Sequence, residues 1–455
     1  MTTNNVYYSD SFVDSVGVNV HATYGIGDIS SSYTLDWLPL LDMLGIRHVR
    51  DSFAASGKAR QVQQSIAQLL AAQGVDVLYI LDTPGLIANE ATLLTFLASN
   101  VPEPGGVEPW NEYDVKTGYQ GGSPPQWVND LRVFQPLLYS SIKAVWPQVS
   151  VISSAVSNNI LSVPAGSLLP NADAANIHLY GPPALTPEFS SLFAPSKMAA
   201  YGNQAPGKPL WVTETGLITG NMAASNLKTS ELAAARILPR MLLYCWAPVA
   251  TPGIMSAPAP AGRGGLGAER TYIYELLDSH DSTSIAVTAE DRYGLFKSDL
   301  SPKLAATSIS NLLGLLADPG PGFGLQPLTV TASGPFADRF ELLIFQKRDG
   351  SYWLVFWMGY DTVSDPIGSL GQGSGTDLPD TAYAVPLQFG QAFQQSALYR
   401  PMYGSAPIQQ SGALSSLTVQ ARLDVQVLQL SGKTRPGVRA RGMRSYYDSR
   451  PNSQG

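Results

Sequence analysis

The segment Pro209-Leu210-Trp211-Val212-Thr213-Glu214-Thr215-Gly216 is a short β-rich run that ends in a carboxylate and a glycine. Similar runs recur along the chain with helical patterns between them, at the roughly thirty-residue spacing of strand–helix–strand units. These runs are Val16–His21, Ile46–Asp51, Val75–Leu81, Gly106–Asn111, Val149–Ala155, Ala174–Tyr180 and Thr271–Leu277. Strands that are apolar on both sides are typical of parallel sheets covered by helices. We therefore predict an α/β fold, a closed (β/α)₈ TIM barrel over residues 15–317.

Two alternatives concern this barrel. An open, doubly wound sheet would alternate strands and helices in a similar way. It is disfavoured because no Gly-x-Gly-x-x-Gly segment follows the first run and no P-loop motif occurs, so nucleotide binding is not expected. The eighth strand also has an alternative position at Leu242–Val249, since the segment Ala247–Glu269 before Thr271–Leu277 is rich in Ala, Pro and Gly.

After the Pro- and Gly-rich linker Pro319–Gly322, β-rich runs follow one another without helical patterns. Asp349-Gly350 lies between two of them, which is a strong hairpin signal. In Tyr352–Met358 both alternating sets of side chains are apolar, so we expect a central strand that is covered on both faces. The other candidate strands are Leu328–Ala332, Arg339–Lys347, Ala382–Gln388, Gln395–Tyr399, Leu414–Gln420 and Leu423–Leu430.

This pattern predicts a C-terminal antiparallel β-sandwich over residues 318–432. The N-terminal stretch Val6–Phe12 is a candidate for an additional strand of that sandwich. Residues 433–455 contain six Lys or Arg and one Asp and show no apolar periodicity, so we predict a basic, disordered tail there.

Composition excludes several classes of protein. The net charge is −7, so the chain without its basic tail (+5) carries −12, which disfavours a nucleic-acid partner. One cysteine, Cys245, allows no intrachain disulfide, and the four histidines form no His-x-His or His-Glu-x-x-His pair. We therefore expect neither a metal nor a cofactor. The sequence also has no apolar segment long enough to span a membrane, and no signal peptide is expected.

Two runs end in carboxylates where a buried strand leaves the barrel. The fourth run ends Pro109-Trp110-Asn111-Glu112, and the seventh ends at Glu214. The fourth and seventh strands lie roughly across the barrel mouth from each other, so the two carboxylates are expected to face each other there. Facing carboxylates in unequal environments suit cleavage of a glycosidic bond, which needs a proton donor and a nucleophile or base.

These motifs resemble those of clan A glycoside hydrolases. The chain is most similar to the family 39 group, which joins a (β/α)₈ barrel to a β-sandwich and includes β-xylosidases, α-L-iduronidases and endoglycosidases of bacterial exopolysaccharides. Pro109-Trp110-Asn111-Glu112 resembles the motif of the acid/base, and Trp211–Gly216 resembles the motif of the nucleophile. The resemblance thus implies a retaining glycosidase in which Glu112 transfers the proton and Glu214 attacks.

The resemblance also implies a set of substrate-binding or supporting residues. Arg50 matches an arginine of the second strand that supports the nucleophile, and His178-Leu179-Tyr180 resembles the His-x-Tyr of the sixth strand. Arg50 and Tyr180 are expected to lower the pKa of Glu214. The eighth run lacks the tryptophan that many members use as a sugar platform, and Tyr274 is its candidate replacement. The remaining candidates for substrate contact are Asn111, Trp110 and His21.

The expected substrate is a polysaccharide or oligosaccharide. The alternative from another class is a non-catalytic carbohydrate-binding protein on a silenced glycosidase barrel. The sugar, the linkage and the choice between endo and exo cleavage depend on the strand-end loops Tyr113–Gln126, Gly181–Ser196 and Ser279–Arg292. Action outside the cell or in the periplasm fits such a substrate, and the sequence predicts no oligomeric state.

Overall fold

The structure is a computed structural model of the 455-residue chain. It describes residues 1–22, 35–53, 57–81, 98, 101–115, 125–155, 171–180, 207–219, 229–248, 265–278, 292–363 and 376–433. The expected tail, apart from Lys433, lies outside these residues, as do 116–124, 181–196 and 279–291 of the strand-end loops. Among the described helices, none has both the length and the apolar character that a membrane span requires.

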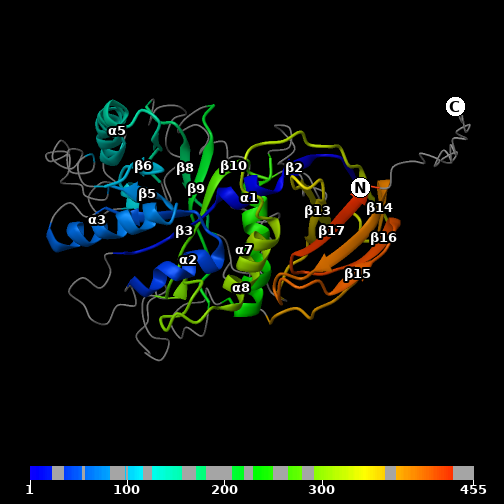
Figure 1. Cartoon of the computed structure of the whole chain (residues 1–455). Helices are drawn as coiled ribbons and strands as arrows, with labels where there is room; N and C mark the ends of the chain where they lie inside the picture. The colour runs from blue at the N-terminus through cyan, green and yellow to red at the C-terminus, as the bar shows by residue number, and fades with distance from the viewer. Residues whose placement is uncertain are drawn as a thin grey trace, which may run out of the picture.

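One sheet consists of eight parallel strands (Figure 1). Its strands are β3 (Val16–Asn19), β4 (His48–Ser52), β5 (Asp76–Ile80), β6 (Gly106–Glu108), β7 (Ser150–Val151), β8 (Ala175–His178), β9 (Leu210–Thr215) and β10 (Ala268–Ile273). They neighbour each other in the order β7-β6-β5-β4-β3-β10-β9-β8, and a parallel bridge between Ile152 and Ala174 joins the two outer strands. The predicted (β/α)₈ barrel is therefore confirmed, and β10 is its eighth strand.

The barrel interior is polar at the carboxyl ends of the strands and apolar below them. Large side chains fill the apolar part, where Tyr272 lies against Gly17 of the neighbouring strand β3 and Trp211 reaches Gly106 of β6 across the barrel. A Cβ atom at Gly17 would lie 2.5 Å from the Tyr272 ring, so only glycine fits there. The carboxyl ends of the strands carry buried polar side chains instead, and the candidate site is built from these.

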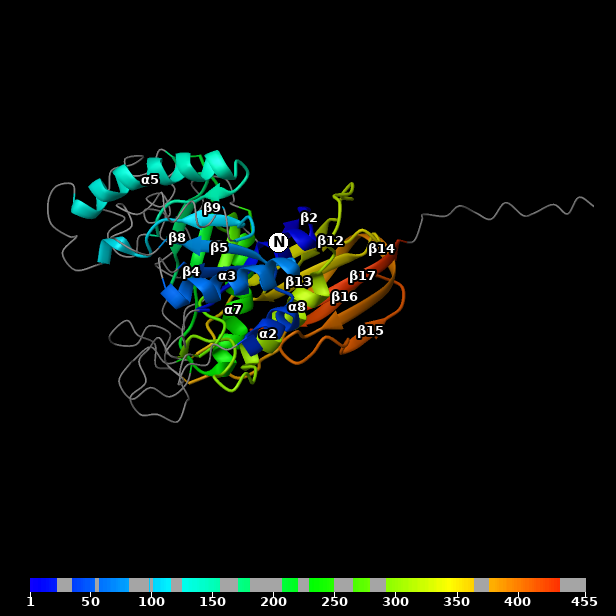
Figure 2. The ribbon, with the colours of Figure 1, turned by 60° about the vertical axis from the view of Figure 1, so that its left-hand side comes forward.

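Helices surround the barrel, and Figure 2 shows α5 along its outer side. The helical elements are α1 (Ser9–Ser15), η1 (Leu35–Trp37), α2 (Leu38–Leu44), α3 (Gly57–Ala72), η3 (Tyr113–Val115), α5 (Gln126–Val145), α7 (Glu231–Trp246) and α8 (Leu304–Leu316). Because α7 runs through Leu242–Trp246, the alternative position of the eighth strand at Leu242–Val249 is wrong.

Helix α7 lies between the barrel and the second sheet (Figure 1). Its first turn is capped by Ser230, whose hydroxyl accepts a hydrogen bond from the Ala233 amide at 2.9 Å. Covered from both sides, α7 buries both of its arginines: Arg236 donates to the Leu378 carbonyl at 2.8 Å, and Arg240 donates to that of Tyr360 at 3.1 Å. These bonds join the barrel to the C-terminal part.

The second sheet has nine strands and is mainly antiparallel. They are β1 (Thr2–Thr3), β2 (Val6–Tyr8), β11 (Val330–Ala332), β12 (Phe340–Gln346), β13 (Tyr352–Met358), β14 (Tyr383–Tyr399), β15 (Gln409–Ser411), β16 (Leu414–Ala421) and β17 (Gln426–Lys433). The long strand β14 pairs with β11 and β16 along its first part and with β15 and β17 along its second part. The two runs expected at Ala382–Gln388 and Gln395–Tyr399 are therefore one continuous strand.

Strand β13 is covered on both faces, as its sequence predicts. The side chains on one face, Tyr352, Leu354 and Phe356, belong to a hydrophobic core formed with side chains from other strands of the second sheet. The alternate residues, such as Trp353 and Trp357, belong to the core that continues into the barrel. The hairpin before β13 is also confirmed, since Gly350 has φ 83° between β12 and β13.

The N-terminal stretch differs in part from the expectation for Val6–Phe12. Only β2 is a strand, and it pairs with β12 in parallel rather than antiparallel. From Ser9 the chain is helical, because Phe12 is fully buried against Trp246 and Phe345. Burial against these rings outweighs the weak strand alternation of this stretch.

The glycine that ends the seventh strand motif is required by packing. A Cβ atom at Gly216 would lie 1.9 Å from the carbonyl oxygen of Tyr274. We expect Gly216→Ala to lower the free energy of unfolding by about 1–3 kcal/mol through this overlap, measured by urea denaturation. The matched control is Gly314→Ala in α8, where no atom lies within 4 Å of the added Cβ. That change should stabilise the protein by about 0.5–1 kcal/mol, and equal effects of both changes would contradict this interpretation.

Candidate active site

The guanidinium of Arg50 is the centre of a buried network at the carboxyl ends of the barrel strands. Arg50 is 2% exposed, and its Nε donates to Glu108 Oε1 at 2.6 Å. Its Nη1 donates to Glu214 Oε1 at 2.7 Å and to Asn19 Oδ1 at 2.8 Å. Its Nη2 donates to Asn111 Oδ1 at 2.7 Å. One cation is thus shared between two carboxylates and two amides.

Glu214 lies near the end of β9 and is 7% exposed. Besides Arg50, it accepts a hydrogen bond on Oε2 from the Tyr180 hydroxyl at 2.7 Å. Burial alone would raise the pKa of Glu214, but the charges of His178 and Arg50 outweigh this effect. Together with the hydrogen bonds from Tyr180 and Arg50, they lower the pKa of Glu214 below its ordinary value. The expectation that Arg50 and Tyr180 lower this pKa is confirmed.

Glu112 lies in the turn that follows β6, and 28% of its side chain is exposed. Its φ of 43° is in the left-handed region, which a residue with a side chain rarely adopts. Backbone strain of this kind is often found at functional sites. Glu112 Oε1 lies 2.7 Å from His178 Nδ1, which is a short hydrogen bond between the two side chains.

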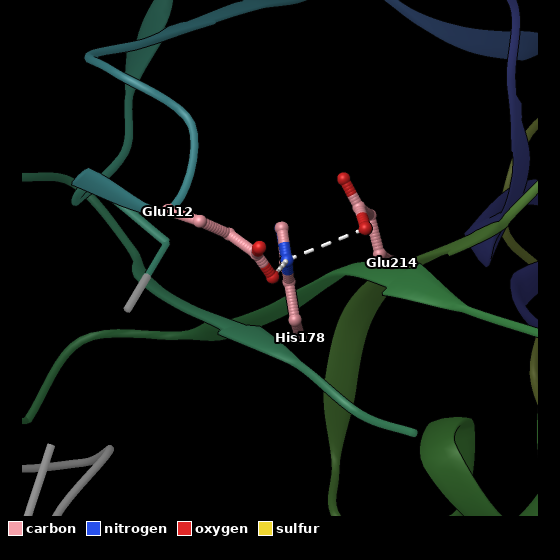
Figure 3. A group of neighbouring side chains, drawn as sticks. All are labelled: Glu112, His178 and Glu214. Atoms are coloured by element: carbon pink, nitrogen blue, oxygen red, sulfur yellow. Dashed lines mark hydrogen bonds and ion pairs between the residues drawn. The ribbon is translucent and has the colours of Figure 1, made fainter. Parts of the chain in front are cut away.

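Glu112 and Glu214 face each other on either side of His178 (Figure 3). His178 ends β8, where it is the register partner of Glu214, and its Nδ1 lies 3.3 Å from Glu214 Oε2. One oxygen of each carboxylate and one ring nitrogen of His178 all lie within 4.8 Å of one another. The two catalytic candidates, about a hundred residues apart in sequence, therefore meet in one cluster.

Among the described residues, these three side chains are the one group close enough to share a metal ion. Two ligands of a Zn²⁺ ion at about 2.0–2.2 Å each would lie farther from one another than a hydrogen bond allows. The 2.7 Å contact between His178 Nδ1 and Glu112 Oε1 is instead the length of a charge-assisted hydrogen bond. The geometry fits a direct hydrogen bond between these side chains better than metal binding.

Three residues that form hydrogen bonds with Arg50 or Glu108 are absent from the sequence-based candidates, namely Asn19, Glu108 and Asn176. Glu108 is fully buried in β6, and its Oε2 accepts a hydrogen bond from Asn176 Nδ2 at 2.6 Å. Asn176 in turn accepts one from the Thr213 hydroxyl at 2.6 Å. Asn176 lies inside β8, whereas Asn19 and Glu108 are the last residues of β3 and β6. A charged residue at the end of a short strand that is fully buried is the signal that could have identified Glu108.

His21 and Tyr274 lie beside Tyr180 and form the wall of the site on the side of strands β3 and β10. Tyr274 packs edge-on against Tyr180, with ring centroids 6.4 Å apart, and against Tyr293 at 5.3 Å. The His21 ring also contacts Tyr274 edge-on at 5.6 Å. His21 Nε2 lies 3.1 Å from the carboxylate of the buried Glu275. Burial by itself would lower the pKa of His21, but the hydrogen bond and charge of Glu275 outweigh this effect and raise it.

Trp110 is placed in the core and not at the ligand side of the site. Its side chain has no exposed surface and stacks on Phe134 with centroids 4.6 Å apart, and it also packs against Tyr113. A strand-end aromatic next to Asn111 therefore turns inward, because the outer helix α5 offers it an apolar surface. This burial leaves no surface of Trp110 for a substrate to contact.

Comparisons with known proteins yield similarities in structure only. No protein-family model matches the sequence, and the search of curated proteins gives no match. One similar structure is a family 5, subfamily 18, glycoside hydrolase from Bifidobacterium longum subsp. infantis, with a TM-score of 0.46 and 13% identity over 66% of this chain and 78% of that chain.

Two further structures are similar. A β-1,3-glucanosyltransferase from Rhizomucor miehei has a TM-score of 0.43 and 17% identity over 65% of this chain and 96% of that one. A family 2 β-galacturonidase from Eisenbergiella tayi has a TM-score of 0.40 and 14% identity over 71% of this chain. The match covers 53% of the galacturonidase, so this chain corresponds to about half its length. Similarity at this level does not assign an activity.

Proposed function

We propose that this protein is a retaining glycoside hydrolase that cleaves O-glycosidic bonds of a polysaccharide or oligosaccharide by double displacement. The observation that carries the proposal is the approach of Glu112 and Glu214, with one oxygen of each within 4.8 Å. Retaining enzymes place their carboxyl groups about 5–5.5 Å apart, whereas inverting enzymes leave roughly 6.5–9.5 Å for a water molecule. An approach of these oxygens within 4.8 Å supports the retaining alternative.

In the first step, Glu112 donates its proton to the glycosidic oxygen while a carboxylate oxygen of Glu214 attacks the anomeric carbon. The bond between that carbon and the glycosidic oxygen breaks, and a glycosyl-enzyme ester forms on Glu214. In the second step, Glu112 takes a proton from water, which attacks the same carbon and releases Glu214. Two displacements on one carbon retain its configuration.

The environments of the two carboxylates support this division of roles. Glu214 is buried and held ionised by Arg50, His178 and Tyr180, as a nucleophile requires. Glu112 is more exposed and forms a hydrogen bond with His178, and an acid/base needs such access to water.

The neighbouring residues have proposed roles in binding. Asn111 accepts a hydrogen bond from Arg50, which orients its amide and makes Nδ2 the donor toward a sugar 2-hydroxyl. His21 and Tyr274 form the wall beside Tyr180, where Tyr274 would take the place of the tryptophan platform. Trp110 has no role in this proposal beyond packing.

Chemical rescue tests the proposal. Glu112→Ala removes the acid/base, so turnover of an activated aryl glycoside should stall at the glycosyl-enzyme, with a loss of about 10²–10⁴-fold. Azide needs no base, so it should restore turnover and yield a glycosyl azide of retained configuration. Proton NMR of the product determines its anomeric configuration. Glu103→Ala changes an exposed glutamate of the same segment and should behave as the parent does.

A substrate for these experiments is first found by screening a panel of polysaccharides and aryl glycosides with the parent protein. The release of new reducing ends is measured for each compound. A product azide of inverted configuration would overturn the assignment of roles. Polysaccharide binding by the parent protein without any turnover in the panel would favour the carbohydrate-binding alternative.

A further inference from the structure

We propose that Glu108 is a positioning residue that shares Arg50 with Glu214 and serves as the resident counter-ion of Arg50 while Glu214 is esterified. This inference rests on the proposed function and deepens it. Glu108 has no exposed surface, so it acts through Arg50 and not through contact with the substrate.

Glu108 is held so that it fixes one side of the Arg50 guanidinium. Its Oε1 accepts from Arg50 Nε at 2.6 Å and also contacts Nη2, while its Oε2 accepts from Asn176 at 2.6 Å. Because Nε is bound to Glu108, Nη1 is directed to Glu214 and Nη2 to Asn111. The position of Glu108 on β6 therefore determines how the guanidinium meets the nucleophile on β9.

The charges of the network change during the proposed reaction. In the resting site, Arg50 lies between two carboxylates, each of which receives only part of its attraction. When Glu214 becomes an ester, it loses its negative charge. Without Glu108, Arg50 would then be a buried cation without an ionised partner, which is strongly unfavourable. With Glu108 in place, a charge pair persists through the glycosyl-enzyme.

A neutral residue at position 108 should therefore act on the two steps in opposite directions. Arg50 would bind only Glu214, so the ionised nucleophile is stabilised and its attack slows. The same stronger attraction favours departure of the carboxylate in the second step, so hydrolysis of the ester is accelerated. Structural damage, by contrast, would slow both steps.

Two variants separate charge from shape. Glu108→Gln keeps the shape and loses the charge, whereas Glu108→Asp keeps the charge and is one methylene shorter. With a dinitrophenyl glycoside that the parent cleaves, we expect E108Q to lower kcat/KM by at least about tenfold and to lose the pre-steady-state burst. E108D should retain the burst and stay closer to the parent. The reverse order, with E108D more affected than E108Q, would overturn the proposal.

A titration independent of turnover accompanies the kinetics. In the full chain with ¹³C-labelled Glu carboxylates, the Glu214 signal is assigned by its absence in E214Q. The ionisable groups around Glu108 include Arg50 of β4, His178 of β8, Glu214 of β9 and Tyr272 of β10. Removal of the negative charge at 108 should shift the Glu214 titration to lower pH in E108Q and leave it nearly unchanged in E108D.

The outcomes are distinguishable. A parent protein without turnover would reject the proposed function, whereas an unchanged Glu214 titration in E108Q would reject the sharing of Arg50. Circular dichroism and urea unfolding monitor folding, and Glu103→Gln is the exposed control. If E108Q does not fold, E108D decides: a retained burst with an unchanged titration supports the proposal, and a lost burst overturns it.

Discussion

Glu214→Ala is expected to lower kcat by about 10⁴-fold or more on the best substrate of the parent protein, since loss of a nucleophile removes the covalent route. Two hydrogen bonds hold the Glu214 carboxylate in place, because Arg50 and Tyr180 each donate to one of its oxygens at 2.7 Å. Initial rates of reducing-end release at saturating substrate measure the effect. Substrate binding, followed by calorimetry, should persist because the wall residues His21 and Tyr274 are unchanged.

The control for this change is Glu103→Ala, which removes a carboxylate from an exposed position and should leave the rate within about twofold of the parent. Azide should also restore Glu214→Ala, but with a product of inverted configuration, because only one displacement then occurs. Near-parental turnover by a folded Glu214→Ala protein would show that another group attacks the substrate, and the proposed function would fall.

Arg50→Ala is expected to destabilise the folded protein by about 3–5 kcal/mol, measured by urea denaturation at pH 7. The reason is that Glu108, which is fully buried, would lose the cation that pairs with its carboxylate. Burial already raises the pKa of Glu108 despite the opposing charge of Arg50, and the change removes that opposition. The variant should also lose activity, since Glu214 and Asn111 both lose a partner.

The destabilisation should depend on pH in a definite direction. A carboxyl group whose folded pKa lies above its unfolded value favours folding at low pH, and this contribution is lost as pH rises through the folded pKa. The deficit of Arg50→Ala should therefore shrink as pH falls from 7 toward 4. Arg348→Ala, which breaks a partly exposed pair with Asp318, should cost less than about 1 kcal/mol. Equal losses in the two variants would contradict the central position of Arg50.

Local patterns were sufficient for much of the fold. The eight β-rich runs correspond to β3–β10. A short apolar run between helical patterns is typical of a parallel strand that helices cover on both sides. The hairpin at Asp349-Gly350 was predictable since Gly350 adopts the positive φ that such a turn requires. Glu112 and Glu214 were identified for a related reason: each is a carboxylate next to a strand end, where the barrel fold gathers polar groups.

Other features depend on contacts between distant segments and left no local signal. Helix α1 begins at Ser9 because Phe12 is covered by rings from α7 and β12. Trp110 turns into the core because α5 presents Phe134 to it. The Glu108–Asn176 hydrogen bond joins β6 and β8, which are not adjacent in the sheet. The sequence pattern of either strand therefore does not predict this bond.

The amino-acid sequence by itself determined that a (β/α)₈ barrel precedes a β-rich part and that two glutamates stand at the ends of its fourth and seventh strands. Those properties follow from short-range periodicity and turn chemistry, which act within one or two elements. The tertiary structure alone decided that both glutamates meet at His178 and that Arg50 is divided between Glu108 and Glu214. Side-chain distances across a closed barrel are set by the register and packing of all eight strands at once.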